Sequence, residues 1–494
     1  MRPELRELMQ TQRLMKNSIQ LFAGALMTLV VAASAHGGDP RIDSWFTKDS
    51  GRYARIYQTV GDETNGTSVT TWSRGQGTQS LPVYAGVREI SSSANWVYIR
   101  SSGLASYVMG PWYLNAAKTQ LFPNYPANQR VLYRIPRNPT IPPVKTLTGL
   151  GAVGYFVNGV ALFDNRDAFY WNGSSEVMGN GLWNRDAYVN ESVTFDAALA
   201  HQAGANHHYH ANPIALRFQL DDHVNYDAVS NRYTESASQP LKHSPIVAWA
   251  RDGFPIYGPY GYSNPTNAAS GVRRMVSGFV QRNGQNGSTN LPVTGRTSLP
   301  QWAMRAYGRT NQLAANEYGP AVSAAYPLGR YVEDNEYLGD LGRTFGVDFD
   351  LDEYNVRFCV TPEFPEGTNA YFVTLTSTGA PAFPYNLGRS FFGNPTGNAV
   401  ASITEPVTTN FVGGANSELR MKTPAKTNSV VTLVWSATEG GTYRVESAGN
   451  LSAWTTNASG VSAVRNQGSH TAADGPSNQF FRVTRTGLAT YDTN

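Results

Sequence analysis

The sequence predicts a mainly β protein, with a large β-rich domain followed by a small C-terminal β-sandwich. The 494 residues include 47 Gly and 28 Pro, which break helices and favour turns. Short runs rich in β-branched and aromatic residues recur between these turn signals, as expected for strands. Charged residues make up only 15% of the chain, so we expect a surface that is polar mainly through Asn, Ser, Thr and Gln.

The N-terminal segment has the pattern of a secretory signal peptide. Residues 18–35 carry no charge, follow Arg13 and Lys16, and end in the small-residue sequence Ala33-Ser34-Ala35. We therefore expect residues 1–35 to be a signal peptide and the mature chain to begin near His36. This predicts a secreted, periplasmic or cell-surface protein. No later stretch is apolar enough to predict a membrane span in the mature protein.

Residues 40–405 are expected to form the large β-rich domain. Strand-like runs occur at residues 96–100, 130–135 and 153–163. The last of these contains Asn158-Gly159 between two apolar segments, which is a strong signal for a β-hairpin. Residues 264–300 are rich in Asn, Ser, Thr and Gly, which predicts a long surface insertion.

The character of the chain changes after about residue 405. Residues 406–428 have the Thr, Asn and Gly content of a linker, and residues 429–487 contain closely spaced β-type runs separated by turn signals. These runs lie at residues 430–435, 441–447, 451–454 and 480–484, and they predict a small β-sandwich. The segment resembles the Ig- or fibronectin-like modules found at the C-termini of exported bacterial proteins.

Charge and cysteine content exclude several classes of function. The net charge of +3 comes without a basic stripe, which argues against a nucleic-acid partner. The only cysteine, Cys359, excludes an intrachain disulfide and argues against cysteine-ligated zinc or iron–sulfur sites.

Histidines are concentrated in one short region. Six of the eight lie between residues 201 and 243. If residues 206–211 are extended, His208 and His210 project from the same face, with His207 and Tyr209 on the other. Two such imidazoles with a third from His201 or His243 would form a site suited to zinc or copper. Asp196 could bind the metal directly or orient a ligating ring.

This region resembles the YHYH domain family, which is named for a Tyr-His-Tyr-His motif. His207-His208-Tyr209-His210 occupies the motif, with His207 in place of its first Tyr. Asp196 and His201 match the residues before it, whereas Ala198 and Ala200 stand where the family has Cys and Gly. Residues 243–261 match a second signature and residues 350–372 a third, so the resemblance covers about residues 145–395. The resemblance implies no established biochemical role.

Other residues suggest further sites. Asp348, Asp350 and Asp352 alternate, so on a strand they would share a face where calcium could bind. Asp196 and Asp252 are weak candidates for a catalytic general base. Aromatic residues between 249 and 262 could stack on a carbohydrate or contact a cell-surface component.

Three functions therefore remain open from the sequence. The first is an exported protein that binds copper or zinc through the histidine cluster. The second is a metal-dependent extracytoplasmic enzyme, either a hydrolase with zinc or an oxidase with copper, which would need an open coordination position. The third is a cell-surface or matrix protein in which the histidines are structural.

Overall fold

The structure is a computed structural model that describes residues 38–236, 238, 240–475 and 479–493. The expected signal peptide, residues 1–35, lies outside the described residues. The chain divides into two units, Met1–Asp43 and Ser44–Asn494. In the described part of the first unit, α2 (Pro40–Asp43) is a single helical turn. All further description concerns the second unit.

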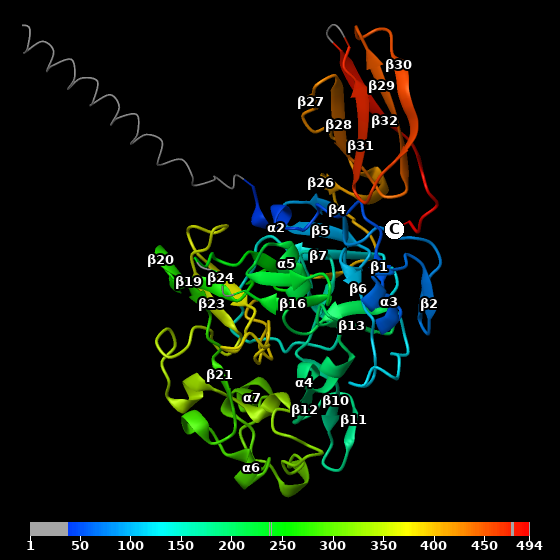
Figure 1. Ribbon diagram of the computed structural model, residues 1–494. Helices are drawn as coiled ribbons and strands as arrows, with labels where there is room; N and C mark the ends of the chain where they lie inside the picture. Colours follow the sequence, from blue (N-terminus) through cyan, green and yellow to red (C-terminus); the bar gives the residue numbers. More distant parts are fainter. Residues whose placement is uncertain (1–37, 237, 239, 476–478, 494) are drawn as a thin grey trace, which may run out of the picture. The chain divides into compact units, whose positions relative to one another are not determined.

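Strands dominate the second unit, which confirms the prediction of a mainly β fold (Figure 1). Its central element is a mixed eight-stranded sheet, and two of its inner strands, residues 246–250 and 255–257, are buried along their whole length. In spatial order the strands are β13 (Ala200–Ala203), β14 (Asn206–Tyr209), β9 (Ala161–Phe163), β8 (Ala152–Phe156), β17 (Ile246–Ala250), β18 (Pro255–Tyr257), β24 (Thr368–Phe372) and β23 (Val356–Cys359).

The hairpin predicted around Asn158-Gly159 is confirmed. β8 and β9 pair antiparallel, and Gly159 adopts a φ of 79° in the turn between them. A Cβ at Gly159 would lie 2.2 Å from the Ser101 hydroxyl oxygen, so both the turn and the close packing require glycine here. The turn fixes the position of β9, the strand that pairs with β14.

A second, five-stranded sheet contains the runs predicted at residues 96–100 and 130–135. Part of the segment expected to be a linker, residues 406–428, is built into this sheet as its last strand, because its backbone pairs with residues 89–92. The strands in spatial order are β25 (Asn398–Ala399), β7 (Val131–Pro136), β5 (Trp96–Ser101), β4 (Val87–Ser92) and β26 (Thr408–Val412).

Smaller ribbons and short helices surround these sheets. The three-stranded ribbon is β11 (Glu176–Met178), β10 (Arg166–Trp171) and β12 (Asn184–Asp186). The two-stranded ribbons are β1 (Arg55–Ile56) with β6 (Val108–Met109), β2 (Trp72–Arg74) with β3 (Gly77–Gln79), β15 (Val224–Asp227) with β16 (Arg232–Glu235), β19 (Tyr260–Asn264) with β20 (Asn267–Arg274), and β21 (Phe279–Gln281) with β22 (Asn335–Tyr337).

The helices of the second unit are all short. The α-helices are α3 (Val60–Asn65), α4 (Ala187–Glu191), α5 (Ile214–Gln219), α6 (Leu291–Thr294) and α7 (Gln301–Ala306). The 3₁₀ turns are η1 (Ser192–Thr194), η2 (Gln285–Gly287), η3 (Ala315–Glu317), η4 (Val332–Asp334), η5 (Leu338–Leu341) and η6 (Gly414–Asn416). Among the described residues, no helix has the length and apolar character needed to cross a bilayer.

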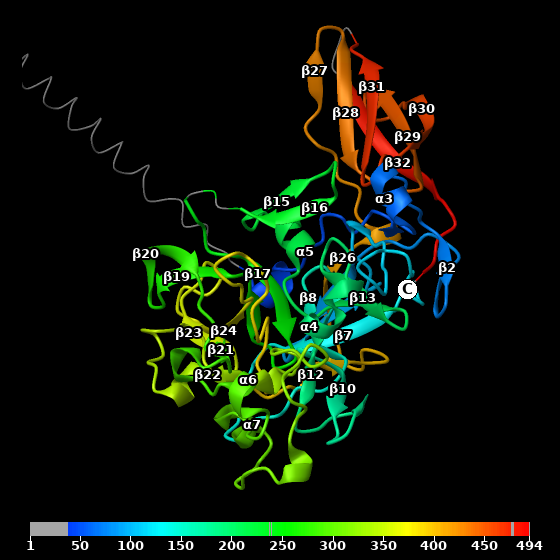
Figure 2. The ribbon, with the colours of Figure 1, turned by 60° about the horizontal axis from the view of Figure 1, so that its bottom comes forward.

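Residues 264–300, expected to be a surface insertion, form more than an exposed loop. β20 and β21 lie within them, and the chain then enters a lobe with α6 and α7 (Figure 2). This lobe has a hydrophobic core of its own that includes Trp183, Phe279, Leu299, Trp302 and Tyr331. Local sequence pattern did not predict this core, because its large residues are scattered among Gly, Asn and Ser.

The C-terminal region is a small β-sandwich, as predicted. One sheet contains β27 (Ala425–Thr427), β28 (Val430–Ser436) and β31 (Gln467–Ala473), and the other contains β30 (Thr455–Ser462), β29 (Gly441–Ala448) and β32 (Phe480–Leu488). Val431, Leu433, Trp435, Tyr443 and Val445 form the core between them. The run predicted as a strand at residues 451–454 is instead a turn before β30. No finding identifies the sandwich as Ig- or fibronectin-like.

Candidate metal centre

A β-hairpin at the edge of the central sheet carries the histidine cluster. β13 and β14 pair antiparallel with His201 directly opposite His208, so these two side chains project from the same face. Gly204 makes the turn between the strands with a φ of 59°. His210 follows His208 by two residues and shares its face. The alternation expected for residues 206–211 is therefore present.

Three imidazole nitrogens converge on one point. The ligating atoms of His201, His208 and His210 lie within 4.8 Å of one another, and all three side chains are buried. The Nε2 atoms of His208 and His210 are 3.0 Å apart. Ligands at 2.0–2.1 Å from a tetrahedral zinc are roughly 3.3 Å from each other. The spacing is therefore close to that of direct metal ligands.

Hydrogen bonds at the far side of each ring fix the tautomers. The Nδ1 of His208 donates to the Asn206 carbonyl at 2.9 Å, and the Nδ1 of His210 donates to the Asp164 carbonyl at 2.6 Å. The Thr194 hydroxyl donates to the Glu191 carbonyl, so it accepts from the Nδ1 of His201 at 2.7 Å. Each neutral ring consequently presents an Nε2 lone pair to the centre of the cluster.

Aromatic side chains hold the rings in place. Phe163, at the end of β9, stacks on His208 with ring centroids 3.9 Å apart and an interplanar angle of 15°. Phe195 lies parallel to His210 at 6.2 Å and edge-on to His201 at 4.8 Å. β14 pairs with β9 in parallel, which brings Phe163 beside the cluster.

Burial keeps most of the cluster uncharged. Desolvation lowers the pKa of His201 to about 3 and that of His208 well below its usual value. Burial acts in the same direction on His210, but the Glu191 carboxylate, whose Oε2 lies 3.1 Å from its Nε2, outweighs this effect and raises its pKa. Two of the three rings are therefore neutral, the form that binds metals.

Glu191 is a fourth potential donor that the sequence did not reveal. Its Oε2 atom lies 3.1 Å from the Nε2 of His210 and 3.5 Å from the Nε2 of His201. It ends α4, whose first turn is capped by the carboxylate of Asp186 through the Val189 N–H at 2.9 Å. Tyr385 donates to that cap at 2.8 Å, so buried hydrogen bonds position the helix that carries Glu191.

A cavity of about 350 Å³ opens onto the cluster. Its walls include apolar side chains, the three histidines and Glu191. Asp167 also lines it, and desolvation raises the pKa of this carboxyl group to about 7 despite the nearby Arg185 guanidinium. A small molecule could therefore reach a metal held by the histidines.

Two sequence-predicted residues lie elsewhere or serve another role. His243 is buried among Tyr257, Tyr262 and Phe372, and it is not part of the convergent group. Asp196 accepts backbone N–H groups from Gly110, Ala198 and Ala200, so its carboxylate shapes the turn that leads into β13 rather than contacting a ring.

Asp252 also has a structural environment. Its carboxylate accepts the Tyr371 hydroxyl at 2.5 Å and the N–H groups of Phe254 and Gly393, and it is completely buried. These bonds join β17 and β18 to β24 at the middle of the sheet. No wall of the cavity at the histidine cluster includes Asp252.

The calcium site expected at Asp348, Asp350 and Asp352 has no support. Asp350 forms an ion pair with Arg273 at 2.6 Å, and Asp348 accepts a backbone N–H from Thr344. Asp352 accepts the N–H groups of residues 354 and 356. Within the part of the chain that the structure describes, the three histidines are the only group found that could hold a metal.

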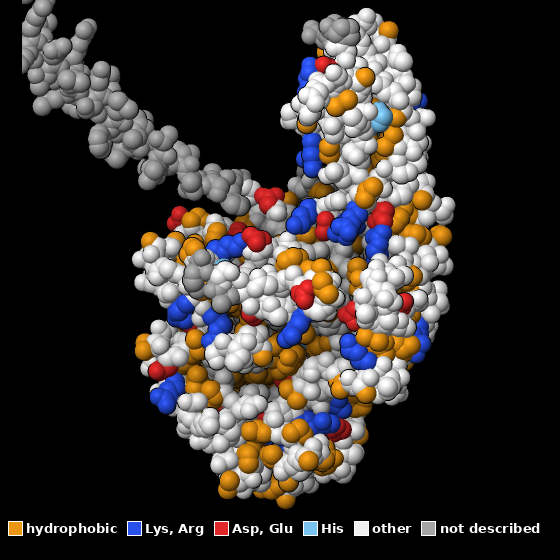
Figure 3. All heavy atoms as spheres, viewed as in Figure 1, with side chains coloured by type: hydrophobic (Ala, Val, Ile, Leu, Met, Phe, Trp, Pro, Cys, Tyr) orange, Lys and Arg blue, Asp and Glu red, His pale blue; other side chains and the backbone are white. Residues whose placement is uncertain are grey.

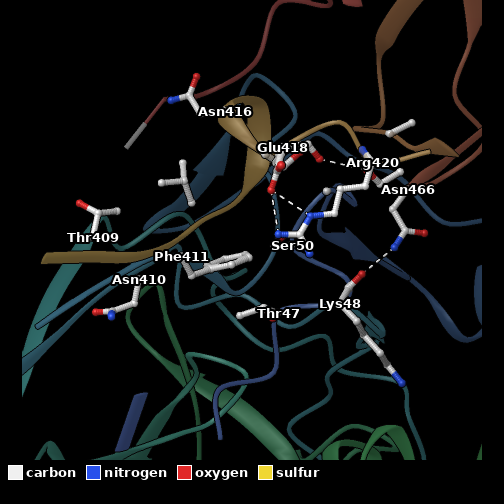
Figure 4. Close-up of a pocket in the computed structure, with 15 residues that line it drawn as sticks. Thr47, Lys48, Ser50, Thr409, Asn410, Phe411, Asn416, Glu418, Arg420 and Asn466 are labelled. Atoms are coloured by element: carbon white, nitrogen blue, oxygen red, sulfur yellow. Dashed lines mark hydrogen bonds and ion pairs between the residues drawn. The ribbon is translucent and has the colours of Figure 1, made fainter. Parts of the chain in front are cut away.

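A further hollow of the second unit lies away from the cluster. It has a volume of about 550 Å³ and is lined mainly by polar side chains and backbone (Figure 4). Its charged residues are Lys48 and the ion pair of Glu418 with Arg420, which are exposed. On the face shown in Figure 3, acidic and basic side chains are interspersed. Neither feature supports a carbohydrate or cell-surface partner.

A family model described as YHYH protein matches residues 132–383. The chain belongs to the YHYH protein family. The matched region contains the whole histidine cluster, Glu191 and the eight strands of the central sheet, and it is close to the interval of 145–395 expected from the sequence. None of the curated proteins and none of the solved structures matches the chain.

Within the YHYH motif, alternate residues face different environments. His208 and His210 enter the cluster, whereas His207 and Tyr209 pack on the opposite face beside Tyr107. The Tyr107 and Tyr209 hydroxyls are 2.5 Å apart. His207, which replaces the first Tyr of the motif, is fully buried, and desolvation lowers its pKa to about 3. The replaced position therefore lies on the face opposite the three convergent histidines.

Proposed function

We propose that this YHYH protein is an exported metal-binding protein that holds one copper or zinc ion through His201, His208 and His210. The observation that carries the proposal is the convergence of three Nε2 lone pairs whose opposite Nδ1 atoms all donate to other groups. Without a cation or an extra proton between them, two such lone pairs 3.0 Å apart would repel. Imidazole nitrogen suits zinc and copper.

Two buried atoms give further support. The Nε2 of His201 and the Oε2 of Glu191 have no hydrogen-bond partner. Buried polar atoms are normally satisfied, and those left unpaired need an explanation such as an ion. A metal at the centre of the cluster would satisfy the His201 nitrogen. Glu191 would then either complete the coordination or lie beside an open position.

Metal analysis of purified mature protein tests this function. We expect one equivalent of zinc or copper in the wild type and none in the double variant His208→Ala, His210→Ala. His223→Ala is the matched control, because this half-buried histidine bonds to the Lys242 carbonyl outside the cluster. A double variant that retains one equivalent of metal would place the site elsewhere.

Export is the second part of the proposal and rests on the pattern of residues 1–35. N-terminal sequencing of protein recovered from the periplasm or the medium should give a start near His36. Retention of residues 18–35 in a membrane fraction would contradict export by signal-peptide cleavage.

A metal-dependent hydrolase is the second candidate function, because a 350 Å³ cavity opens onto the cluster. A metal held by three histidines keeps a position for water and lowers the pKa of that water. Glu191, whose Oε2 lies 3.1 Å from the Nε2 of His210, would lie beside such a metal and could serve as the general base in hydrolysis of an ester or phosphodiester.

Metal-loaded protein should be assayed with p-nitrophenyl acetate and bis-p-nitrophenyl phosphate. Hydrolysis that falls about 100-fold in Glu191→Gln, with metal content retained, would support this candidate. If the loaded wild type hydrolyses neither compound faster than free metal does, these data would favour binding or delivery of the metal alone.

A further inference from the structure

A second pocket, separate from the histidine cluster, gathers positive charge. It has a volume of about 350 Å³ and shares no lining residue with the cavity at the metal centre. Its charged lining residues are Lys145, Arg305 and Arg389, with Glu353 as the only acidic one. Trp302 and Tyr354 contribute aromatic walls.

Arg389 is the unusual member of this group. Its side chain is only 6% exposed, and its Nε atom has no hydrogen-bond partner. One terminal nitrogen donates to the carbonyl and hydroxyl oxygens of Thr148 at 2.6 and 3.0 Å. Among the described residues, no carboxylate forms an ion pair with it. A buried guanidinium without a counter-charge is costly unless another anion supplies one.

The other two cations differ in how far they are neutralised. Arg305 is paired with both Asp340 and Glu353, at 2.8 and 2.7 Å. The Nζ of Lys145 donates to the Phe392 carbonyl and lies 5.2 Å from the centre of the Tyr354 ring, without a carboxylate partner among the described residues. The pocket therefore contains two cations, Lys145 and Arg389, that form no ion pair with a carboxylate among the described residues.

Local pairing of the backbone brings these two cations to the same pocket. Residues 146–148 run antiparallel to residues 389–391, with Leu147 opposite Ser390. Thr148 donates its N–H to the Arg389 carbonyl at 3.0 Å, and Phe391 donates to the Thr146 carbonyl at 2.9 Å. The two segments are thus held in register independently of any ligand.

We propose that this pocket binds a small oxyanion, a carboxylate or a phosphate, between Lys145 and Arg389. A guanidinium with free N–H donors matches two oxygens of such a group, and an ammonium adds a point charge beside it. The Ser390 hydroxyl, which also lines the pocket, supplies a further donor. The site is independent of the proposed metal function, since none of its residues belongs to the histidine cluster.

Calorimetric titration of full-length mature protein with inorganic phosphate and with succinate tests the proposal. The protein is treated with a chelator and held at constant ionic strength, so that neither anion binds a metal. We expect saturable binding of one equivalent of at least one anion, and the two titrations distinguish phosphate from carboxylate. Lys145→Gln and Arg389→Lys should each weaken binding about tenfold.

Lys426→Gln is the control, because this exposed lysine of the sandwich is paired with Asp474 and lies outside the pocket. It should bind as the wild type does. If Arg389→Lys fails to fold, the half-buried Lys145→Gln decides the outcome. The absence of saturable binding of both anions at about 10 mM, or affinity unchanged in Lys145→Gln, would overturn the proposal.

Discussion

The Nε2 atom of His208 lies 3.0 Å from the Nε2 atom of His210, and the Nδ1 atom of each ring donates to a backbone carbonyl. Carbonyl oxygens can only accept, so when both rings are neutral neither has a proton on Nε2 with which to bridge that gap. The backbone of residues 164 and 206 thus dictates that both lone pairs meet. A metal ion bound between the two rings would require this arrangement of nitrogens.

Thr194 should influence metal affinity without touching the metal. Its hydroxyl accepts from the Nδ1 of His201 at 2.7 Å and thereby keeps the Nε2 lone pair directed at the cluster. Mutation of a group that hydrogen-bonds to a ligating histidine typically lowers metal affinity by about 10–100-fold. We expect Thr194→Val to weaken metal binding by at least tenfold in a competitive titration with a chelator.

The matched control for this change is Thr374→Val. Thr374 is also buried, and its hydroxyl donates to the Ala382 carbonyl at 2.6 Å, away from the cluster. Thr374→Val should lower the free energy of unfolding without lowering metal affinity. Equal losses of affinity in the two variants would mean that Thr194 acts only through folding.

His243 should make stability depend on pH. Burial lowers its pKa to about 4, whereas in the unfolded chain the value is near 6.5. The unfolded state therefore takes up the proton first as the pH falls. His243 therefore has little effect on the free energy of unfolding at pH 7 and destabilises the folded protein increasingly as the pH falls from about 6.5 to 4.

By pH 5 the loss from His243 should reach about 2 kcal/mol in the free energy of unfolding. Urea unfolding of chelator-treated wild type and His243→Gln at pH 7 and pH 5 measures it. The variant should lose about 2 kcal/mol less than the wild type over this interval. Equal losses in the two proteins would show that His243 is not held neutral by burial.

Local sequence pattern was sufficient for one part of the metal centre. The alternation of an extended chain predicted that His208 and His210 share a face, and the Asn158-Gly159 signal predicted the hairpin that holds β9 beside them. The assignment of His201 or His243 as a third donor remained open. The strand register favours His201, because the β13–β14 hairpin places it opposite His208.

The rest of the centre depends on tertiary contacts that have no local signature. Glu191 ends a short helix that is capped by a buried carboxylate, and Thr194 belongs to the 3₁₀ turn that follows it. Phe163 comes from a strand paired in parallel with β14. None of these residues is spaced regularly relative to the histidines. Closeness in sequence to the other histidines also did not predict the position of His243. This residue precedes β17 and packs among aromatic residues outside the cluster.

Residues 429–487 should fold on their own. Their core is formed within the sandwich by Leu433, Trp435 and Tyr443, which are fully buried. We expect the isolated fragment to give a cooperative thermal transition in circular dichroism. Trp435→Ala should abolish it, because such truncations cost about 3–5 kcal/mol.

Contacts with the large domain make the boundary of this fragment testable. Glu439 forms an ion pair with Arg55 and accepts the Tyr53 N–H at 2.8 Å, while the Asn466 side chain donates to the Lys48 carbonyl at 2.6 Å. A fragment that spans residues 417–489 adds β27 and serves as the comparison. If only the longer fragment unfolds cooperatively, the sandwich begins before residue 429.

Tyr371 should stabilise the fold through its hydrogen bond to Asp252. The role of the Asp252 carboxylate would then be structural rather than catalytic. The Tyr371 hydroxyl donates to Asp252 at 2.5 Å and accepts the Phe392 N–H at 2.7 Å. Both side chains are completely buried. Tyr371→Phe leaves a buried carboxylate and a buried N–H with one partner fewer, so we expect a loss of about 1–3 kcal/mol in the free energy of unfolding.

Metal content separates this structural role from a role at the metal centre. Because Asp252 is not among the residues that line the cavity at the histidines, Tyr371→Phe and Asp252→Asn should both keep one equivalent of metal while unfolding at lower urea concentration. Tyr257→Phe provides a comparison, since its buried hydroxyl bonds to Thr361 and Glu363 instead. Loss of metal from folded Asp252→Asn, but not from folded Tyr257→Phe, would restore Asp252 as a functional residue.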